Sequence, residues 1–142
     1  MDTAKTRTIL DSNIVLDALF PEAPWHEWSL RLLAVEAEVG ELLINPVIFA
    51  EVSPRFESHT ELRHSLLQLD IALEHLPWEA AYRAGRAHAV YRKLGGSRER
   101  TLPDFFIGAH ASVSGLRLIT RDSARYRTYF PSLDIIAPDS HP

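Results

Sequence analysis

The stretch that most constrains the fold of this chain is residues 7–17, RTILDSNIVLD. Thr8 to Leu10 is typical of a short buried strand, and Asp11 follows it directly. The next residues favour the start of a helix, and apolar side chains then recur at helical spacing. In open α/β sheets, ligands bind in the crevice outside the carboxyl ends of the strands. Asp11 is therefore placed where a carboxylate can take part in chemistry.

The same order of strand and helix recurs along the rest of the chain. Further strands are predicted at 42–44, 71–76, 116–120 and 133–136, and helices at 25–39, 46–53, 60–69, 78–94 and 103–114. Strands that alternate with helices favour a parallel sheet with helices on both faces. A length of 142 residues suits one domain that spans residues 1–142.

The composition excludes several kinds of site and location. The chain has no cysteine, so disulfides, thiolate zinc sites and a cysteine nucleophile are excluded. The N-terminal residues lack the apolar core of a secretion signal, and no apolar run approaches the ~20 residues that span a membrane. We therefore expect a cytoplasmic protein that makes no membrane contact.

The net charge of −4 hides an asymmetry between two parts of the chain. Residues 1–82 hold five basic and fourteen acidic residues, whereas residues 83–127 hold ten basic residues, nine of them arginine, and three acidic ones. The basic part indicates a polyanionic partner, and arginine suits the forked recognition of phosphate. Ordinary solvated helix faces would give the same pattern, so charge alone leaves both explanations open.

Four acids occupy the same kind of position. Asp11 and Asp122 follow predicted strands, whereas Glu51 and Asp104 lie in the first turns of predicted helices. In a parallel sheet all four positions fall at the carboxyl edge of the strands. Each acid alone also has a structural explanation. Asp11 and Asp122 could cap helices, Asp104 could form a capping box with Thr101, and Glu51 could favour the positive end of its helix.

Four unpaired acids around one crevice would repel one another unless a cation bound among them. Sites made of carboxylate oxygens suit Mg²⁺ or Mn²⁺. Such a cation would activate a water molecule for attack and stabilise the leaving oxygen of a phosphodiester, while arginines held the nucleic-acid backbone. The acids and the arginine-rich part together predict phosphodiester hydrolysis.

Four segments carry a resemblance to a known family. They are LDSNIVLDALF, NPVIFAEV, LPDFFIGAHA and LITRDSARYRTYFPSLDIIAP. In this order and spacing the chain resembles the PIN-domain family, specifically the VapC-type toxins of bacterial toxin–antitoxin operons. The resemblance covers nearly the whole chain. It implies a three-layer α/β/α sandwich around a mostly parallel sheet and a Mg²⁺- or Mn²⁺-dependent endoribonuclease.

The resemblance also assigns roles to individual residues. It places the catalytic acids of the family at Asp11, Glu51, Asp104 and Asp122. It implies that Asp11, Asp104 and Asp122 hold the metal and that Glu51 is an outer ligand or orients the attacking water. It further implies that Asn13 and Thr120 donate hydrogen bonds that fix the geometry of the carboxylates. Arg98, Arg100, Arg121 and Arg125 flank the acids and are candidates for contacts with the RNA backbone, or alternatively for helix-end and salt-bridge roles.

Two other functions compete with the ribonuclease. One is a phosphohydrolase with an aspartyl-phosphate intermediate on Asp11, although such enzymes usually have a second aspartate where this chain has Asn13. The other is a non-catalytic RNA- or protein-binding module of the same fold. If the toxin role holds, a cognate antitoxin should occlude the acidic site. The family also implies a homodimer, for which Trp25, Leu30 and Leu33 are candidate contacts.

Several further expectations concern packing. In the helix predicted at 25–39, one face with Trp28, Leu32, Val35 and Val39 is expected to be buried. The three tryptophans are expected to pack in the core, and the seven histidines to lie at the surface or partly buried. Asp17 is six residues after Asp11 and is expected to be a surface acid.

Overall fold

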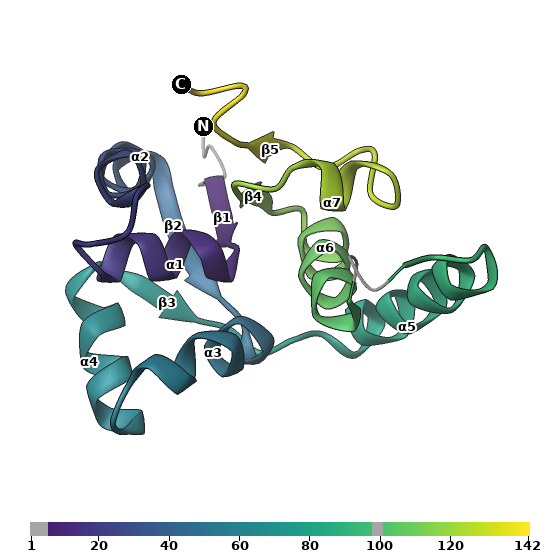
Figure 1. Ribbon diagram of the computed structural model, residues 1–142, viewed down its shortest axis with the longest axis horizontal. Helices are drawn as coiled ribbons and strands as arrows, with labels where there is room; N and C mark the ends of the chain where they lie inside the picture. The colour runs from purple at the N-terminus through teal and green to yellow at the C-terminus, as the bar shows by residue number, and fades with distance from the viewer. Residues whose placement is uncertain (1–5, 98–100) are drawn as a thin grey trace, which may run out of the picture.

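A computed structural model describes residues 6–97 and 101–142 of the chain. Figure 1 shows a central sheet with helices on either side. The elements follow in the order β1 (Thr6–Leu10), α1 (Ser12–Leu19), α2 (His26–Val39), β2 (Gly40–Ile44), α3 (Pro46–Val52), the 3-10 turn η1 (Ser53–Arg55), α4 (His59–Gln68), β3 (Ile71–Leu73), α5 (Trp78–Lys93), α6 (Leu102–Ser114), β4 (Arg117–Ile119), α7 (Ala124–Arg127) and β5 (Ile135–Ile136).

The five strands form one sheet in the order β3-β2-β1-β4-β5, and every neighbouring pair is parallel. The chain therefore moves outward from β1 through β2 to β3, and then crosses back to β4 on the other side of β1. This reversal makes the gap beyond the ends of β1 and β4 the topological switch point, where open α/β sheets bind ligands. Asp11 directly follows β1, and Asp122 lies three residues after β4.

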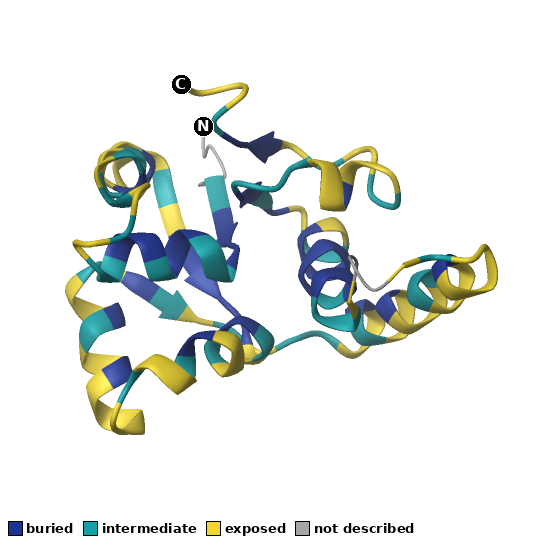
Figure 2. Ribbon diagram, in the orientation of Figure 1, coloured by how far each residue is buried: buried dark blue, intermediate teal, exposed yellow. Residues whose placement is uncertain are grey.

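The strands are buried on both faces, as parallel sheets require. In Figure 1, α1 to α4 lie on one side of the sheet, α6 and α7 lie on the other, and α5 extends outward beside α6. Figure 2 shows the buried residues concentrated on the strands and on the inward sides of these helices. Ile9, Leu43, Ile44 and Leu118 are fully buried in the main core. These observations confirm the predicted three-layer α/β/α sandwich with a parallel sheet.

Some predicted boundaries are wrong, and the predicted face of the helix at 25–39 is correct only for Trp28 and Leu32, which pack against the main core. The strand predicted at 71–76 ends at Leu73. In α2 the buried residues are Ser29, Leu33 and Glu36, whereas Val35 and Val39 are about half exposed. Glu36 can be buried because the Arg117 guanidinium lies 2.7 Å from its carboxylate and neutralises it. An apolar pattern could not reveal this pair, because the two partners are far apart in the sequence.

The tryptophans do not all pack in the core. Trp78, at the start of α5, is 90% exposed, and Trp25 is 38% exposed. Both lie at helix starts, and Trp25 packs edge-on against Trp28 with ring centroids 5.7 Å apart. Leu33 is buried inside its own subunit, so it is excluded as a dimer contact. No helix in the described part of the chain is long and apolar enough to span a membrane.

A second, smaller core joins α5 to α6 through Ala80, Ala84, Tyr91, Phe105 and Ala109. The small side chains bring the two helices together, and the aromatic rings then fill the space at their ends. This packing matters for the site because α6 carries Asp104 in its first turn.

The glycine at position 108 gives a test of this packing. A Cβ atom there would lie 2.4 Å from Cε2 of Phe130, whereas a Cβ at Gly85 in α5 would meet no atom within 4 Å. Gly85→Ala should therefore stabilise the fold by roughly 0.5–1 kcal/mol through helix propensity. Gly108→Ala should destabilise it by about 1–3 kcal/mol through overpacking. Urea denaturation measures both changes.

Replacing Phe130 provides the control for this prediction. In a Phe130→Ala background the ring is gone, and Gly108→Ala should no longer be destabilising. A loss of stability that persists in this background would show that the clash with Phe130 is not the cause.

Candidate metal centre

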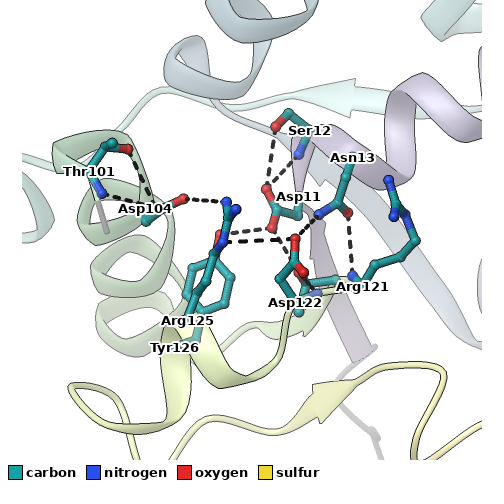
Figure 3. Close-up of polar contacts among 10 residues, drawn as sticks. Asp11, Ser12, Asn13, Thr101, Asp104, Arg121, Asp122, Arg125 and Tyr126 are labelled. Atoms are coloured by element: carbon teal, nitrogen blue, oxygen red, sulfur yellow. Dashed lines mark hydrogen bonds and ion pairs between the residues drawn. The ribbon is translucent and has the colours of Figure 1, made fainter. Parts of the chain in front are cut away.

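Asp11 is the most enclosed acid at the switch point, with only 3% of its surface exposed. Its Oδ1 accepts a hydrogen bond of 2.7 Å from the backbone N–H of Ser12, so the carboxylate also caps α1. Its Oδ2 accepts two more, of 2.8 Å from the Thr120 hydroxyl and 2.9 Å from the Tyr126 hydroxyl (Figure 3). Donors from three residues therefore hold this carboxylate in one orientation.

Within residues 6–97 and 101–142, the charge of Asp11 is not neutralised by the protein itself. Among the described residues no basic side chain forms an ion pair with it. Burial raises the pKa of Asp11 above its ordinary value of 3.8, and the charge of Asp104 adds to this rise, although the donors at Asp11 oppose it. A bound cation would remove this penalty, because it would supply the missing positive charge.

Asp104 lies in the first turn of α6 and is 7% exposed. Its Oδ2 accepts a hydrogen bond of 3.1 Å from the backbone N–H of Thr101, so the capping-box explanation of this acid is correct. Its other oxygen, Oδ1, lies 3.8 Å from the Arg125 guanidinium. Capping uses only one oxygen, and Asp104 therefore also faces the centre of the site with the other.

Asp122 lies in the loop after β4 and is held by Asn13 and Thr120. The Asn13 amide donates a hydrogen bond of 3.2 Å to Asp122 Oδ2, and the Thr120 hydroxyl accepts the backbone N–H of Asp122 at 3.0 Å. Nε of Arg125 lies 3.9 Å from the same Oδ2. Figure 3 shows the Arg125 side chain between Asp104 and Asp122. Arg125 therefore supplies positive charge between two acids that come from α6 and the end of β4.

Glu51 lies near the end of α3 and is exposed as a residue, but its carboxyl group is partly desolvated. This desolvation raises the pKa of Glu51, and the charges of Asp11 and Asp104 raise it further, whereas a hydrogen bond from Ser12 lowers it. The Glu51 carboxylate is therefore close enough to Asp11 and Asp104 to be affected by their charges.

The flanking arginines differ in their surroundings. Nε of Arg121 lies 2.6 Å from Oδ2 of Asp17, without the alignment of a hydrogen bond. Asp17 is 5% exposed, so its prediction as a surface acid is wrong. Asp17 can be buried because Arg121, which follows β4, neutralises its charge. The sequence did not reveal this partner. Arg98 and Arg100 lie outside the described residues.

Tyr126 is the residue at this site that the sequence did not single out. It is fully buried, and its hydroxyl donates to Asp11. Burial and the neighbouring charges of Asp11 and Asp104 raise its pKa well above 10. It therefore stays a neutral donor at physiological pH. Its position one turn after Asp122 was the available signal, but the same position is equally typical of a core aromatic.

The donor chemistry of the site fits a hard divalent cation. Carboxylate oxygens are the ligands that Mg²⁺ and Mn²⁺ prefer. At this site the negative charges of Asp11, Asp104 and Glu51 repel one another. However, no three acidic or histidine side chains in residues 6–97 and 101–142 form a ready-made metal cluster. Arg125 lies between Asp104 and Asp122, so direct ligation by both acids requires this guanidinium to move.

Comparison with known proteins identifies the family. The sequence model of the PIN domain matches residues 8–131, which is most of the chain. This chain belongs to the PIN-domain family. A search of curated proteins finds no match to the sequence.

Solved structures share the fold of this PIN domain. It is similar to VapBC2 of Rickettsia felis, bound to a DNA fragment from its promoter, with 16% identity, a TM-score of 0.68, and 93% of this chain and 98% of that chain covered. VapBC-1 of nontypeable Haemophilus influenzae gives 18% identity, a TM-score of 0.69 and coverage of 93% and 98%. Mycobacterium tuberculosis VapC20, a sarcin-ricin loop cleaving toxin, gives 14% identity, a TM-score of 0.60 and coverage of 78% and 85%.

The raised pKa of Asp11 predicts a pH-dependent effect of Asp11→Asn in metal-free protein. The pKa of Asp11 in the folded protein lies above its ordinary value of 3.8, so the folded wild type is more stable when Asp11 is protonated than when it is charged. This stabilisation is lost as the pH rises through the folded-state pKa. The free energy of unfolding of Asp11→Asn minus that of the wild type should therefore increase as the pH rises above about 4. Urea denaturation in the presence of EDTA measures it.

Asp139→Asn is the control, since Asp139 is exposed and lies 3.7 Å from Arg127, away from the site. A difference between Asp11→Asn and the wild type that decreases with pH would contradict the raised pKa.

Proposed function

We propose that this PIN domain is a Mg²⁺- or Mn²⁺-dependent endoribonuclease that acts as the toxin of a toxin–antitoxin pair. The observation that carries the proposal is the buried carboxylate of Asp11. It has no basic partner among the described residues, and burial together with the charge of the neighbouring Asp104 raises its pKa. A fold that keeps such a charge without neutralising it is suited to a bound cation.

The residues of the chain have distinct tasks in this function. Asp11, Asp104 and Asp122 would hold the cation, and Glu51 would orient the attacking water. When bound, the cation would polarise a phosphoryl oxygen and stabilise the leaving oxygen. Ser12, Thr120 and Tyr126 keep the carboxylate of Asp11 in place, and Asn13 does the same for Asp122. All of these groups therefore serve the geometry of the acids.

The arginines would position the substrate. Arg125 is 47% exposed along its side chain, and it lies at the acids rather than away from them. In this proposal it moves from the acids to a phosphate of the RNA when a cation takes its place. Arg121 is held by Asp17, so it contributes positive charge from a fixed position. Contacts of Arg98 and Arg100 with the RNA backbone are part of the same proposal.

The toxin role is supported by the solved structures that share the fold. Several are described as VapBC or toxin–antitoxin complexes, and VapC20 is described as cleaving the sarcin-ricin loop. By analogy we propose a cognate antitoxin that covers the acidic site of this chain, with a basic side chain among the acids, and a homodimer in the cytoplasm. The position of Arg125 supports the first point, because it shows that a guanidinium fits between Asp104 and Asp122.

The aspartyl-phosphate alternative finds less support. Its nucleophile would be Asp11, which is 3% exposed and has both oxygens occupied by donors. At the position of the usual second aspartate, Asn13 instead donates to Asp122. The groups around Asp11 therefore suit a fixed ligand better than an attacking nucleophile.

RNA cleavage in vitro tests the proposed activity. The wild type with Mg²⁺ or Mn²⁺ should cut RNA and leave 5′-phosphate and 3′-hydroxyl ends, and EDTA should abolish cutting. Asp104→Asn should reduce the rate roughly 100-fold or more, because it removes a charged ligand. Cleavage of end-labelled RNA on sequencing gels measures both rate and product ends.

The matched control is Asp139→Asn, which removes an exposed acid outside the site and should leave the rate unchanged. Equal cutting by Asp104→Asn and the wild type would contradict the assigned site. Retained RNA binding with no cleavage and no Mn²⁺ binding would support the non-catalytic module instead.

Expression in bacterial cells tests the toxin role separately. Induced wild type should arrest growth and generate RNA fragments, whereas Asp11→Asn at the same protein level should do neither, because it lacks the charge that holds the cation. Growth curves with immunoblots and RNA sequencing measure the result. An equal growth arrest by both proteins would rule out RNA cleavage at this site as the cause.

A further inference from the structure

A second polar cluster, centred on His110 of α6, lies apart from the candidate acids Asp11, Glu51, Asp104 and Asp122. His110 is fully buried, so the expectation of a surface or partly buried position is wrong for it. Both ring nitrogens have a partner. Nδ1 lies 3.1 Å from Nδ2 of Asn45, and Nε2 lies 3.2 Å from Oε2 of Glu74. A buried imidazole with both nitrogens bonded has a fixed orientation.

The partners also define which nitrogen carries the proton. Oδ1 of Asn45 accepts the backbone N–H of Ile48 at 3.0 Å, because Asn45 is the N-cap of α3. Its Nδ2 amide is then the group that faces the ring, and an amide N–H donates. Nδ1 of His110 must therefore be the acceptor, and Nε2 carries the proton that is donated to Glu74.

The rest of the cluster keeps this histidine neutral. The other carboxylate oxygen of Glu74 is bound by the Arg7 guanidinium, which also lies 3.3 Å from Glu41. Arg7 therefore already balances the negative charge of Glu74, so His110 does not need to be protonated to do so. Burial lowers the pKa of His110 and Arg7 lowers it further, although Glu74 opposes both.

The hydrogen bond between Asn45 and His110 joins the two helices that carry acids of the candidate site. Glu51 comes six residues after Asn45, at the other end of α3, and Asp104 comes six residues before His110 in α6. At ~1.5 Å of rise per residue, each acid is about 9 Å along its helix from this hydrogen bond. A shift of one helix against the other at this point would change the separation of the two acids.

We propose that His110 is a positioning residue for the metal centre. Held in one neutral tautomer between Asn45 and Glu74, it fixes α6 against α3 and thereby sets the separation of Asp104 and Glu51 for cation binding. The proposal rests on the proposed function, since it assigns His110 to the same site. His110 itself contacts Glu74, but it touches neither the candidate acids of the metal centre nor the reacting atoms.

Three variants of the full-length protein test this role. His110→Phe keeps a ring of similar size and removes both hydrogen bonds. His110→Asn keeps an acceptor near the position of Nδ1 but cannot reach Glu74. Ser58→Ala is the matched control, because it removes the N-cap of α4, whose hydroxyl accepts the backbone N–H of Glu61 at 3.1 Å, and has no contact with His110.

Calorimetric titration of metal-free protein with Mn²⁺ is the main measurement. His110→Phe should weaken Mn²⁺ binding by about 10- to 100-fold, as loss of a residue that orients ligands does, and His110→Asn should fall between it and the wild type. Ser58→Ala should stay close to the wild type. In a second measurement, ¹⁵N NMR of the wild-type histidines should show His110 with a bare Nδ1 and a protonated Nε2.

Two outcomes would overturn the proposal alone. One is Mn²⁺ binding by His110→Phe as tight as that of Ser58→Ala, and the other is a protonated Nδ1 in the wild type. The NMR result does not depend on any variant folding. Absence of Mn²⁺ binding by the wild type would overturn the proposed function and this role together, so the two failures are distinguishable.

Discussion

The structure of this site depends on one buried carboxylate and the donors that surround it. Asp11 ends the central strand, where a carboxylate would normally be avoided because burial disfavours its charge. Its donors come from both ends of the chain. Ser12 follows it directly, whereas Thr120 and Tyr126 lie more than a hundred residues later. The fold must therefore be complete before Asp11 is satisfied.

The topology of the sheet explains how these distant residues meet. Strands β1 and β4 are parallel neighbours. The chain after β1 continues to β2 on one side, whereas the chain after β4 continues to β5 on the other, so the two connections diverge at the switch point. Asp11 and Thr120 lie at the two strand ends, and the backbone N–H of Asp11 donates to Ile119 at 3.0 Å. Helices α3 and α6 then bring Glu51 and Asp104 to the same edge. The candidate acids therefore come from four separate segments, which are the end of β1, α3, the first turn of α6 and the loop after β4.

Charge pairs decide details that hydrophobic patterns cannot. Glu36 and Asp17 are buried because Arg117 and Arg121 come from the end of the chain to neutralise them. His110 is buried because Asn45 and Glu74 satisfy both of its nitrogens. In each case a residue that looks like a surface residue in the sequence lies inside the protein. Its partner lies in another element, so local sequence carries no trace of the pair.

The sequence by itself determined the alternation of strands and helices, the parallel sheet and the candidate acids. These features follow from local periodicity and from the order of elements, which the chain carries directly. The tertiary structure decided which side chains hold the acids. Tyr126 could not be distinguished from a core aromatic, and Arg125 could not be placed between Asp104 and Asp122, until the chain was folded. The physical reason is that hydrogen bonds and ion pairs join residues that are close in space, whereas sequence patterns report only which face of an element is apolar.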